Sequence, residues 1–282
     1  MAFNNSIRES NIKVFEDTCL RIKTSKALQD SIKLSNKSQD IILEKDTIDV
    51  DKVRFPGPVK IHITKSRSFD AAREYTNGKV AVHNFASATN PGGGVVKGSS
   101  AQEECLCRCS TLYKNLTEQE CYDKFYTPHR QGLSALHNDD IIYTPDVVIF
   151  KDDDYNYLNP TDWMKVDIIT CAAPNLRENP KNEYNAESST DKIDISDDEL
   201  YQLHLKRAKR IMDIAAYKGA DILILGAFGC GAFRNNPKVV AKAYKDAVAD
   251  YRHAFKEIEF AIYCGSAKDE GNYTAFKEAF GR

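Results

Sequence analysis

The sequence lacks the features of a membrane-spanning or secreted chain. Within its 282 residues, no apolar run approaches the length of a transmembrane helix. The residues from Met1 to Glu9 contain no apolar core of the kind that a signal peptide carries. We therefore expect a protein of the cytoplasm or nucleus that is not secreted and has no membrane partner.

A strong charge of either sign is also absent. Lysine and arginine number 39, and aspartate and glutamate number 41, which gives a formal net charge of −2. A protein that binds bulk DNA through its phosphates carries an excess of positive charge, so we expect no direct DNA binding. An anionic ligand would have to be held by the local geometry of a site.

Several cofactor and catalytic signatures are missing. The eight cysteines include no C-x-x-C pair, no Ser-His-Asp arrangement stands out, and neither a Rossmann fingerprint nor a Walker loop is present. Without a signal peptide, the cysteines are interpreted as reduced thiols. Cys105 and Cys109 lie one helical turn apart, in line with Leu112 and Leu116, and are interpreted as the buried stripe of a helix. We expect neither a metal nor a cofactor.

Strand and helix patterns alternate along most of the chain. They predict helices at 7–34, 68–75, 102–116, 199–218, 237–255 and 273–280, and strands at 59–64, 79–85, 140–144, 146–151, 167–173, 220–225 and 257–263. This alternation predicts an α/β fold with a central, mostly parallel or mixed sheet. Punctuation by proline and glycine before Val59 indicates a boundary between an N-terminal accessory segment, 1–58, and a main domain, 59–282. The polar stretch 175–198 is either a lid over a ligand or a solvated insertion.

A glycine-rich loop follows the predicted strand 79–85. It contains the consecutive Gly92, Gly93 and Gly94 and a fourth glycine at Gly98. Glycines let the backbone approach a ligand closely, and the free N–H groups of such a loop can face an anion. A second loop, 226–231, follows the predicted strand 220–225 with the spacing G-x-x-G-x-G. It predicts either a phosphate cradle before the helix at Pro237 or a tight turn.

Both loops leave the carboxyl ends of predicted strands, so one ligand could lie between them. Two adjacent carboxylates, Glu103 and Glu104, follow the first loop. Ser100 and Glu103 fit the capping box S-x-x-E, so Glu103 could be structural, functional or both. Glu104 is not needed by the cap. The helix dipole would lower its pKa, and a role as proton donor requires burial or bound phosphate to raise it.

These motifs resemble those of a known family. The stretch from Asn84 to Glu104 is similar to that of bacterial-type poly(ADP-ribose) glycohydrolases, macrodomain proteins whose hallmark is a triple glycine followed by Gln-Glu-Glu. Residues 226–237 resemble their diphosphate-binding loop. The resemblance covers residues 59–282 and extends more loosely through the N-terminal helix. It implies a three-layer α/β/α macrodomain with an N-terminal helical accessory segment.

The resemblance implies hydrolysis of the ribose–ribose O-glycosidic bond and release of ADP-ribose. The partners would be ADP-ribose and poly(ADP-ribose) on modified proteins, with no cofactor and no metal, and we expect a monomer. Glu104 would protonate the leaving oxygen and then deprotonate water, and Glu103 would orient the ribose hydroxyls. Asn90 would hydrogen-bond the distal ribose, and Gly92 to Gly94 would line the ligand, with Gln102 in the same set.

The second loop would hold the diphosphate. By the same resemblance, Gly229, Cys230 and Gly231 would donate backbone N–H groups, and Phe233 would pack on the distal ribose and position the water. Ala232 is small, which predicts looser packing there. Two alternatives stay open: a module that binds ADP-ribose without cleaving it, and a hydrolase that removes single ADP-ribose units. A pure reader has no need of the two glutamates.

Overall fold

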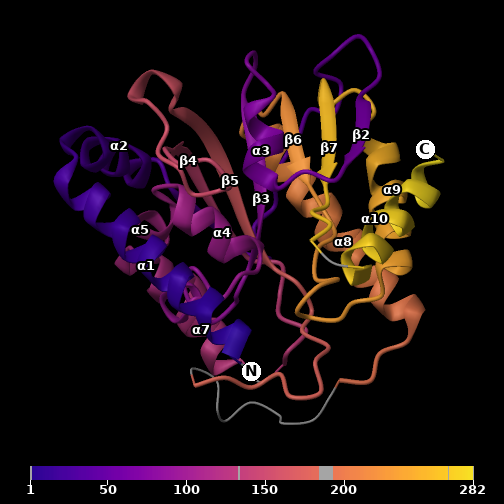
Figure 1. Ribbon diagram of the computed structural model, residues 1–282. Coiled ribbons are helices and arrows are strands. Elements are labelled where there is room, and N and C mark those ends of the chain that lie inside the picture. The colour runs from indigo at the N-terminus through magenta and orange to yellow at the C-terminus, as the bar shows by residue number, and fades with distance from the viewer. Residues whose placement is uncertain (1, 133, 184–192, 266, 282) are drawn as a thin grey trace.

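One mixed sheet forms the centre of the molecule. A computed structural model describes residues 2–132, 134–183, 193–265 and 267–281 (Figure 1). Seven strands are hydrogen-bonded in the order β1-β4-β5-β3-β6-β7-β2. They comprise β1 (Asp40–Ile42), β2 (Lys60–Thr64), β3 (Val80–Ala86), β4 (Ile141–Ile149), β5 (Met164–Ala172), β6 (Ile222–Leu225) and β7 (Glu257–Ala261). The pairs from β5 to β2 are parallel, and β4 and β1 are antiparallel to their neighbours.

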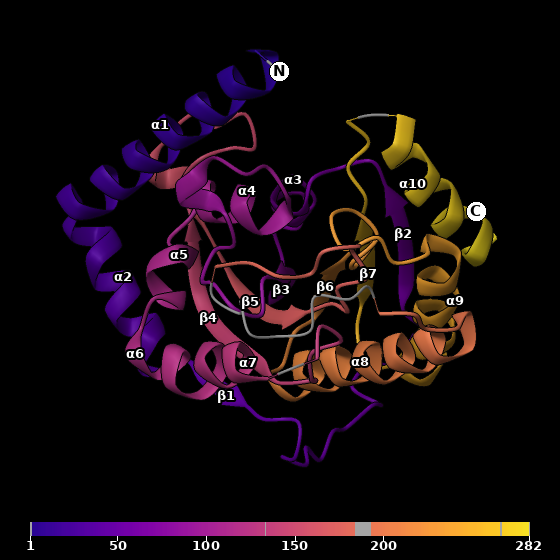
Figure 2. The same cartoon turned by 90° about the horizontal axis from the view of Figure 1, so that it is seen from below.

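Helices cover both faces of this sheet, as the view from below in Figure 2 shows. One core cluster joins the sheet to α3 (Ser68–Arg73), α4 (Gln102–Cys109), α5 (Leu112–Leu116) and α6 (Gln119–Cys121). The other joins it to α8 (Asp197–Tyr217), α9 (Pro237–Val248) and α10 (Ala267–Phe280). A short helix α7 (Thr127–Gln131) follows a π-helical turn, Tyr122–Tyr126. The three-layer α/β/α architecture with a mixed sheet is therefore confirmed.

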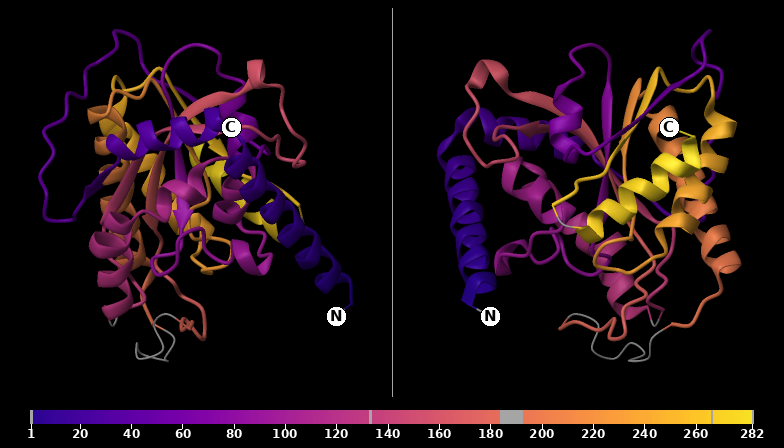
Figure 3. Two further views of the ribbon diagram at one scale, coloured as in Figure 1. Left: turned by 90° about the vertical axis from the view of Figure 1, so that its left-hand side faces the viewer. Right: turned by 45° about the vertical axis from the view of Figure 1, so that its right-hand side comes forward.

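The N-terminal segment is fastened to this core. Its helices α1 (Ala2–Thr24) and α2 (Lys26–Lys37) run down one side of the molecule (Figure 3), and β1 adds an edge strand beside β4. The buried ammonium of Lys151 reaches Asp17 at 2.7 Å and the hydroxyl of Thr18 at 2.9 Å. Because Lys151 has almost no exposed surface, this ion pair with α1 compensates a positive charge that lies away from water.

Some predicted elements differ in detail. The helix expected at 102–116 ends at Ser110, because that residue forms a β-bridge with Ile149, and it resumes as α5. The strands expected at 140–144 and 146–151 are one strand, β4, with a register shift where Asp146 adopts a positive φ of 54°. The helix expected at 7–34 is two helices, since Ser25 caps α2.

The prediction that Cys105 and Cys109 are both buried holds for Cys109 and is wrong for Cys105. Cys109 is buried, as predicted, and Cys107 is buried with it. Cys105 is only half-buried and lines the cavity described below. Cys105 lies on the side of α4 that faces the cavity, where its thiol is 3.6 Å from the hydroxyl of Tyr155. No helix among the described residues is both long and apolar enough to cross a lipid bilayer.

Candidate active site

A large cavity opens at the carboxyl ends of the parallel strands. Its volume is about 1070 Å³. The loop after β3 and the loop after β6 both line it, and these two strands are hydrogen-bonded neighbours. The prediction that the two glycine loops lie at one edge of the sheet is confirmed. A ligand in this cavity would lie at the edge where α/β sheets commonly bind their ligands.

The triple glycine holds carboxylates in this structure. The N–H of Gly94 donates to Oε1 of Glu104 at 2.8 Å, and the backbone of Gly92 hydrogen-bonds Glu103. The N–H of Gly93 donates to the carbonyl of Asn90 at 2.9 Å. These groups were expected to face an anion of the ligand. Their acceptors are instead protein groups, two of them the paired glutamates.

Glycine is required at position 93 for a steric reason. Its φ is 58°, in the left-handed region, and a Cβ there would lie 2.6 Å from Oε1 of Glu104 and 3.1 Å from Oε2 of Glu103. Both distances are shorter than ordinary van der Waals contacts. Gly93 and Gly94 line the cavity, whereas Gly92 faces Tyr113 and Cys107 behind it.

The capping-box interpretation of Glu103 is wrong. The N-cap residue of α4 is Ala101, and no side chain caps the helix. The carboxylate of Glu103 reaches back to β3 instead, where Oε2 accepts from the N–H of Ser87 at 2.7 Å and Oε1 from the amide of Asn84 at 3.3 Å. Burial, and second the charge of Glu104, raise the pKa of Glu103 to about 8.

Glu104 presents an acidic group to the cavity. Its side chain is 7 % exposed, and Oε2 is buried without a hydrogen-bond partner among the described residues. Burial raises the pKa of Glu104, although the N–H of Gly94 and the charge of Arg108 act in the opposite direction. Burial thus supplies the compensation that the helix dipole requires. A protonated carboxyl of this kind can donate to an oxygen that enters the cavity.

The second loop is held from behind by Asn235. This residue is 2 % exposed, and its amide donates to the carbonyls of Pro174 at 2.7 Å and Gly229 at 3.0 Å. Its Oδ1 lies 2.8 Å from Nε2 of His204 on α8. Gly229 has a φ of 75°, and a Cβ there would lie 2.8 Å from that of Ala173. The loop is therefore a constrained turn.

The predicted ligand residues of this loop are divided between cavity and core. Gly229, Gly231, Ala232 and Phe233 line the cavity. Cys230 is buried behind them, and its N–H already donates to the carbonyl of Ala227 at 3.1 Å. For the N–H groups of Gly229, Gly231 and Ala232, the structure gives no acceptor among the residues it describes. Backbone donors that converge on a cavity are suited to an anion.

Gln102 and Asn90 line the cavity but use their amides internally. Gln102 accepts from the N–H of Phe85 at 2.9 Å and donates to the carbonyl of His83 at 2.7 Å. It thereby locks α4 to β3. The amide of Asn90 donates to the carbonyl of Gly93 and closes the glycine loop.

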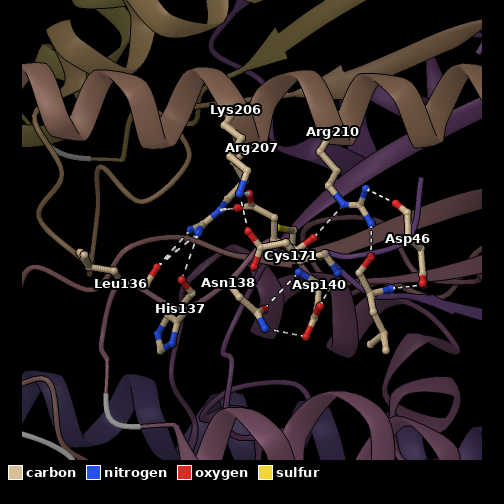
Figure 4. A network of polar contacts seen from close by, with 12 residues as sticks. Asp46, Leu136, His137, Asn138, Asp140, Cys171, Lys206, Arg207 and Arg210 are labelled. Atoms are coloured by element: carbon tan, nitrogen blue, oxygen red, sulfur yellow. Dashed lines mark hydrogen bonds and ion pairs between the residues drawn. The ribbon is translucent and has the colours of Figure 1, made fainter. Parts of the chain in front are cut away.

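A buried ion pair supports the edge of the site from α8. Arg207 contacts Asp139 at 2.6 Å and donates to the carbonyl of Ala172 at 2.7 Å, at the end of β5 (Figure 4). Its guanidinium also reaches the carbonyls of Leu136 and His137. His137 lines the cavity, so this network fixes part of the cavity wall.

Sequence reasoning missed three residues that position the site: Asn84, Asn235 and Arg207. Each is buried and polar. A buried polar side chain is not recognisable from sequence, because its partners come from distant segments. Asn84 and Asn235 carried a signal, since each lies in one of the two stretches that resemble the family, 84–104 and 226–237. Among the described residues, no group of three or more His, Cys, Asp or Glu side chains is placed to hold a metal ion.

The fold is macrodomain-like, and the cavity wall carries two adjacent carboxyl groups, Glu103 and Glu104. A family model described as "Microbial-type PARG, catalytic domain" matches residues 8–152. The chain therefore belongs to the microbial-type poly(ADP-ribose) glycohydrolase (PARG) family, and it is a glycosidic hydrolase. The family expected from the two loops is confirmed. A search of curated proteins found no match.

Solved structures of bacterial glycohydrolases are similar over nearly the whole chain. Poly(ADP-ribose) glycohydrolase from Thermomonospora curvata is 25% identical, with a TM-score of 0.81, and the match covers 96% of this chain and 100% of that one. The same enzyme bound to the inhibitor ADP-HPD is 26% identical, with a TM-score of 0.77 and coverage of 96% and 99%. The Deinococcus radiodurans enzyme in complex with ADP-ribose is 30% identical, with a TM-score of 0.72 and coverage of 89% and 97%.

Proposed function

We propose that Glu104 is the general acid and base of this glycohydrolase. The observation that carries the proposal is the state of its carboxyl group. One oxygen is fixed by the N–H of Gly94, and the other is buried without a partner in the wall of the cavity. Burial raises the pKa of this carboxyl, which favours the protonated form that a general acid needs. The substrate would be poly(ADP-ribose) on modified proteins.

The reaction then follows from this geometry. Glu104 donates its proton to the oxygen that leaves with the next ribose, and the bond from that oxygen to the anomeric carbon of the terminal ribose breaks. The oxocarbenium-like centre that forms reacts with a weak nucleophile. Water bonds to the anomeric carbon and gives one proton back to Glu104. The products are a chain shortened by one unit and free ADP-ribose.

The remaining residues would bind the terminal unit. Glu103 would accept hydrogen bonds from the ribose hydroxyls, since it lies beside Glu104 on α4. The free N–H groups of Gly229 and Gly231 would hold the diphosphate. Phe233 would pack on the distal ribose, with the guanidinium of Arg177 over its ring at 5.6 Å. These roles rest on the position of each residue in the cavity wall.

The test is substitution of Glu104. In Glu104→Gln, the rate of ADP-ribose release from poly(ADP-ribose) should fall by about 10²–10⁴-fold, the usual contribution of general acid–base catalysis. Calorimetric Kd for ADP-ribose should change by less than about threefold, since the isosteric amide keeps the cavity. Glu120→Gln, on exposed α6, is the matched control and should retain wild-type activity.

Two outcomes would contradict the assignment. Turnover of Glu104→Gln at the wild-type rate would exclude Glu104 as the acid. Release of ADP-ribose from mono-ADP-ribosylated protein but not from polymer, by the wild-type enzyme, would point to the alternative hydrolase.

A further inference from the structure

The cavity extends beyond the residues assigned to the terminal unit. Its volume of about 1070 Å³ lies at the upper end of the range of roughly 300–1,000 Å³ for sites that hold a small ligand. From the loop 226–233 it passes Glu104 and reaches the first helix, whose residues Ile7, Arg8 and Asn11 line it. Figure 2 shows α1 beside α4, on the side of the glycine loop away from α8 and α9.

This helix is fixed to the segment that carries Glu104. The buried amide of Asn11 donates to the carbonyl of Gly98 at 3.0 Å. Gly98 has a φ of 73°, and a Cβ there would collide with the backbone of Arg8. Beyond the glutamate, Thr18 donates to the carbonyl of Arg108 at 2.6 Å. The helix is therefore attached both before and after Glu104, and its cavity-facing residues keep a set position relative to the acid.

Arg8 brings an uncompensated positive charge to this wall. Its side chain is exposed, and it has no ion-pair or hydrogen-bond partner among the described residues. Lys97, another cation of the cavity wall, is paired with Glu183 at 2.5 Å. A guanidinium can bind phosphate oxygens through two parallel hydrogen bonds.

We propose that α1 forms the binding site for the next ADP-ribose unit of the polymer, with Arg8 bound to the diphosphate of that unit. The inference rests on the proposed function, because Glu104 must protonate the oxygen of the next ribose. If the terminal diphosphate lies at Gly229 and Gly231, the leaving unit continues past Glu104 in the opposite direction. That direction ends at α1, and the phosphates of the leaving unit require a cation there.

The experiment compares two substrates in variants of Arg8. One is poly(ADP-ribose), and the other is an ADP-ribose aryl glycoside whose leaving group has no phosphate. Arg8→Ala should lower kcat/KM for the polymer about tenfold and leave the aryl glycoside and the Kd of ADP-ribose unchanged. Arg8→Glu should lower polymer turnover further, and Arg8→Lys should restore part of it. The difference in polymer kcat/KM between Arg8→Ala and the wild type should become smaller as the salt concentration rises, because salt screens the attraction between Arg8 and the diphosphate.

Lys13→Ala is the matched control, because Lys13 is an exposed cation of the same helix that does not line the cavity. It should leave both substrates unchanged. Unchanged polymer turnover in Arg8→Ala and Arg8→Glu would overturn the inference, and so would an equal loss for both substrates. If the wild-type enzyme cleaves neither substrate, the proposed function fails instead.

Discussion

Gly93 has no side chain, and the carboxyl groups of Glu103 and Glu104 lie in the space that a side chain there would occupy. Gly93→Ala should impair catalysis because its Cβ would meet both glutamates, at 2.6 and 3.1 Å. An alanine with φ near 58° also costs about 1–2 kcal/mol in backbone conformation. We expect polymer turnover to fall by about 10²-fold, as misplaced catalytic groups typically cause, with a lower midpoint of thermal unfolding.

The control for this variant is Gly57→Ala, where a Cβ would meet no atom within 4 Å and φ is not positive. It should retain turnover and stability. Wild-type kinetics in Gly93→Ala would show that the carboxyl groups do not need the space that glycine leaves.

At the residue scale, the positions of the site residues could be predicted from the sequence, whereas their hydrogen-bond partners could not. The resemblance selected Glu103, Glu104 and Gln102, and all three line the cavity. The capping box assigned to Glu103 was wrong, because spacing along a helix cannot show that a carboxylate reaches another strand. The amide of Gln102 likewise forms hydrogen bonds with the backbone of β3, at Phe85 and His83.

At the element scale, the loop after β6 depends on Asn235. Asn235→Ala would leave the carbonyl of Pro174 and Nε2 of His204 without this partner, whereas the carbonyl of Gly229 keeps the backbone N–H of residue 235 at 3.0 Å. Unsatisfied buried groups cost about 1–3 kcal/mol each, so we expect a loss of about 2 kcal/mol in the free energy of unfolding, measured with urea. Calorimetric affinity for ADP-ribose should fall as the loop loosens.

Asn236→Ala is the neighbouring control. Asn236 caps α9 through the N–H of Lys238 at 3.1 Å, so its loss should cost about 1 kcal/mol. Affinity for ADP-ribose should stay at the wild-type value. Equal affinities in the two variants would contradict the role given to Asn235.

The elements predicted best were those with strong local patterns. The strands at β2, β3, β6 and β7 lie within two residues of their predicted bounds. The break of the helix at Ser110 was missed. It depends on pairing with β4, a contact between distant segments that leaves no periodic pattern in the sequence.

At the scale of the whole molecule, the cavity is a composite of segments from the entire chain. Its wall includes Arg8 near one end of the sequence and Asn272 near the other. The two glycine loops were predicted to meet because the carboxyl ends of parallel strands share one edge. The contribution of α1 could not be predicted, because it depends on Gly98 and Asn11 meeting across 87 positions.

The buried titratable groups predict how global stability depends on pH. Burial lowers the pKa of His83 and His137 to about 3 and of His204 to about 4, from an ordinary value of 6.5. These histidines therefore bind more protons in the unfolded chain than in the folded one at pH 4–6.5, so their contribution to stability rises with pH there. Burial raises the pKa of Glu103 from 4.5 to about 8 and that of Asp153 from 3.8 to about 7. These carboxyls make the folded chain bind more protons, so their contribution is full at low pH and is lost as pH rises toward 8.

Below pH 6.5 the lowered pKa values of the histidines and the raised pKa values of the carboxyls act on stability in opposite directions, and above it only the carboxyls still titrate. We therefore expect the free energy of unfolding in urea to decline as pH rises from 6.5 to 8. Glu103→Gln removes one of the groups that cause the alkaline decline, so its stability should fall less between pH 6.5 and 8, by up to about 1.4 kcal/mol per pH unit. His62→Gln, at a histidine whose ring is 41% exposed, is the control and should leave the alkaline decline as it is. A decline of equal steepness in Glu103→Gln and the wild type would show that Glu103 is already ionised in the folded protein at neutral pH.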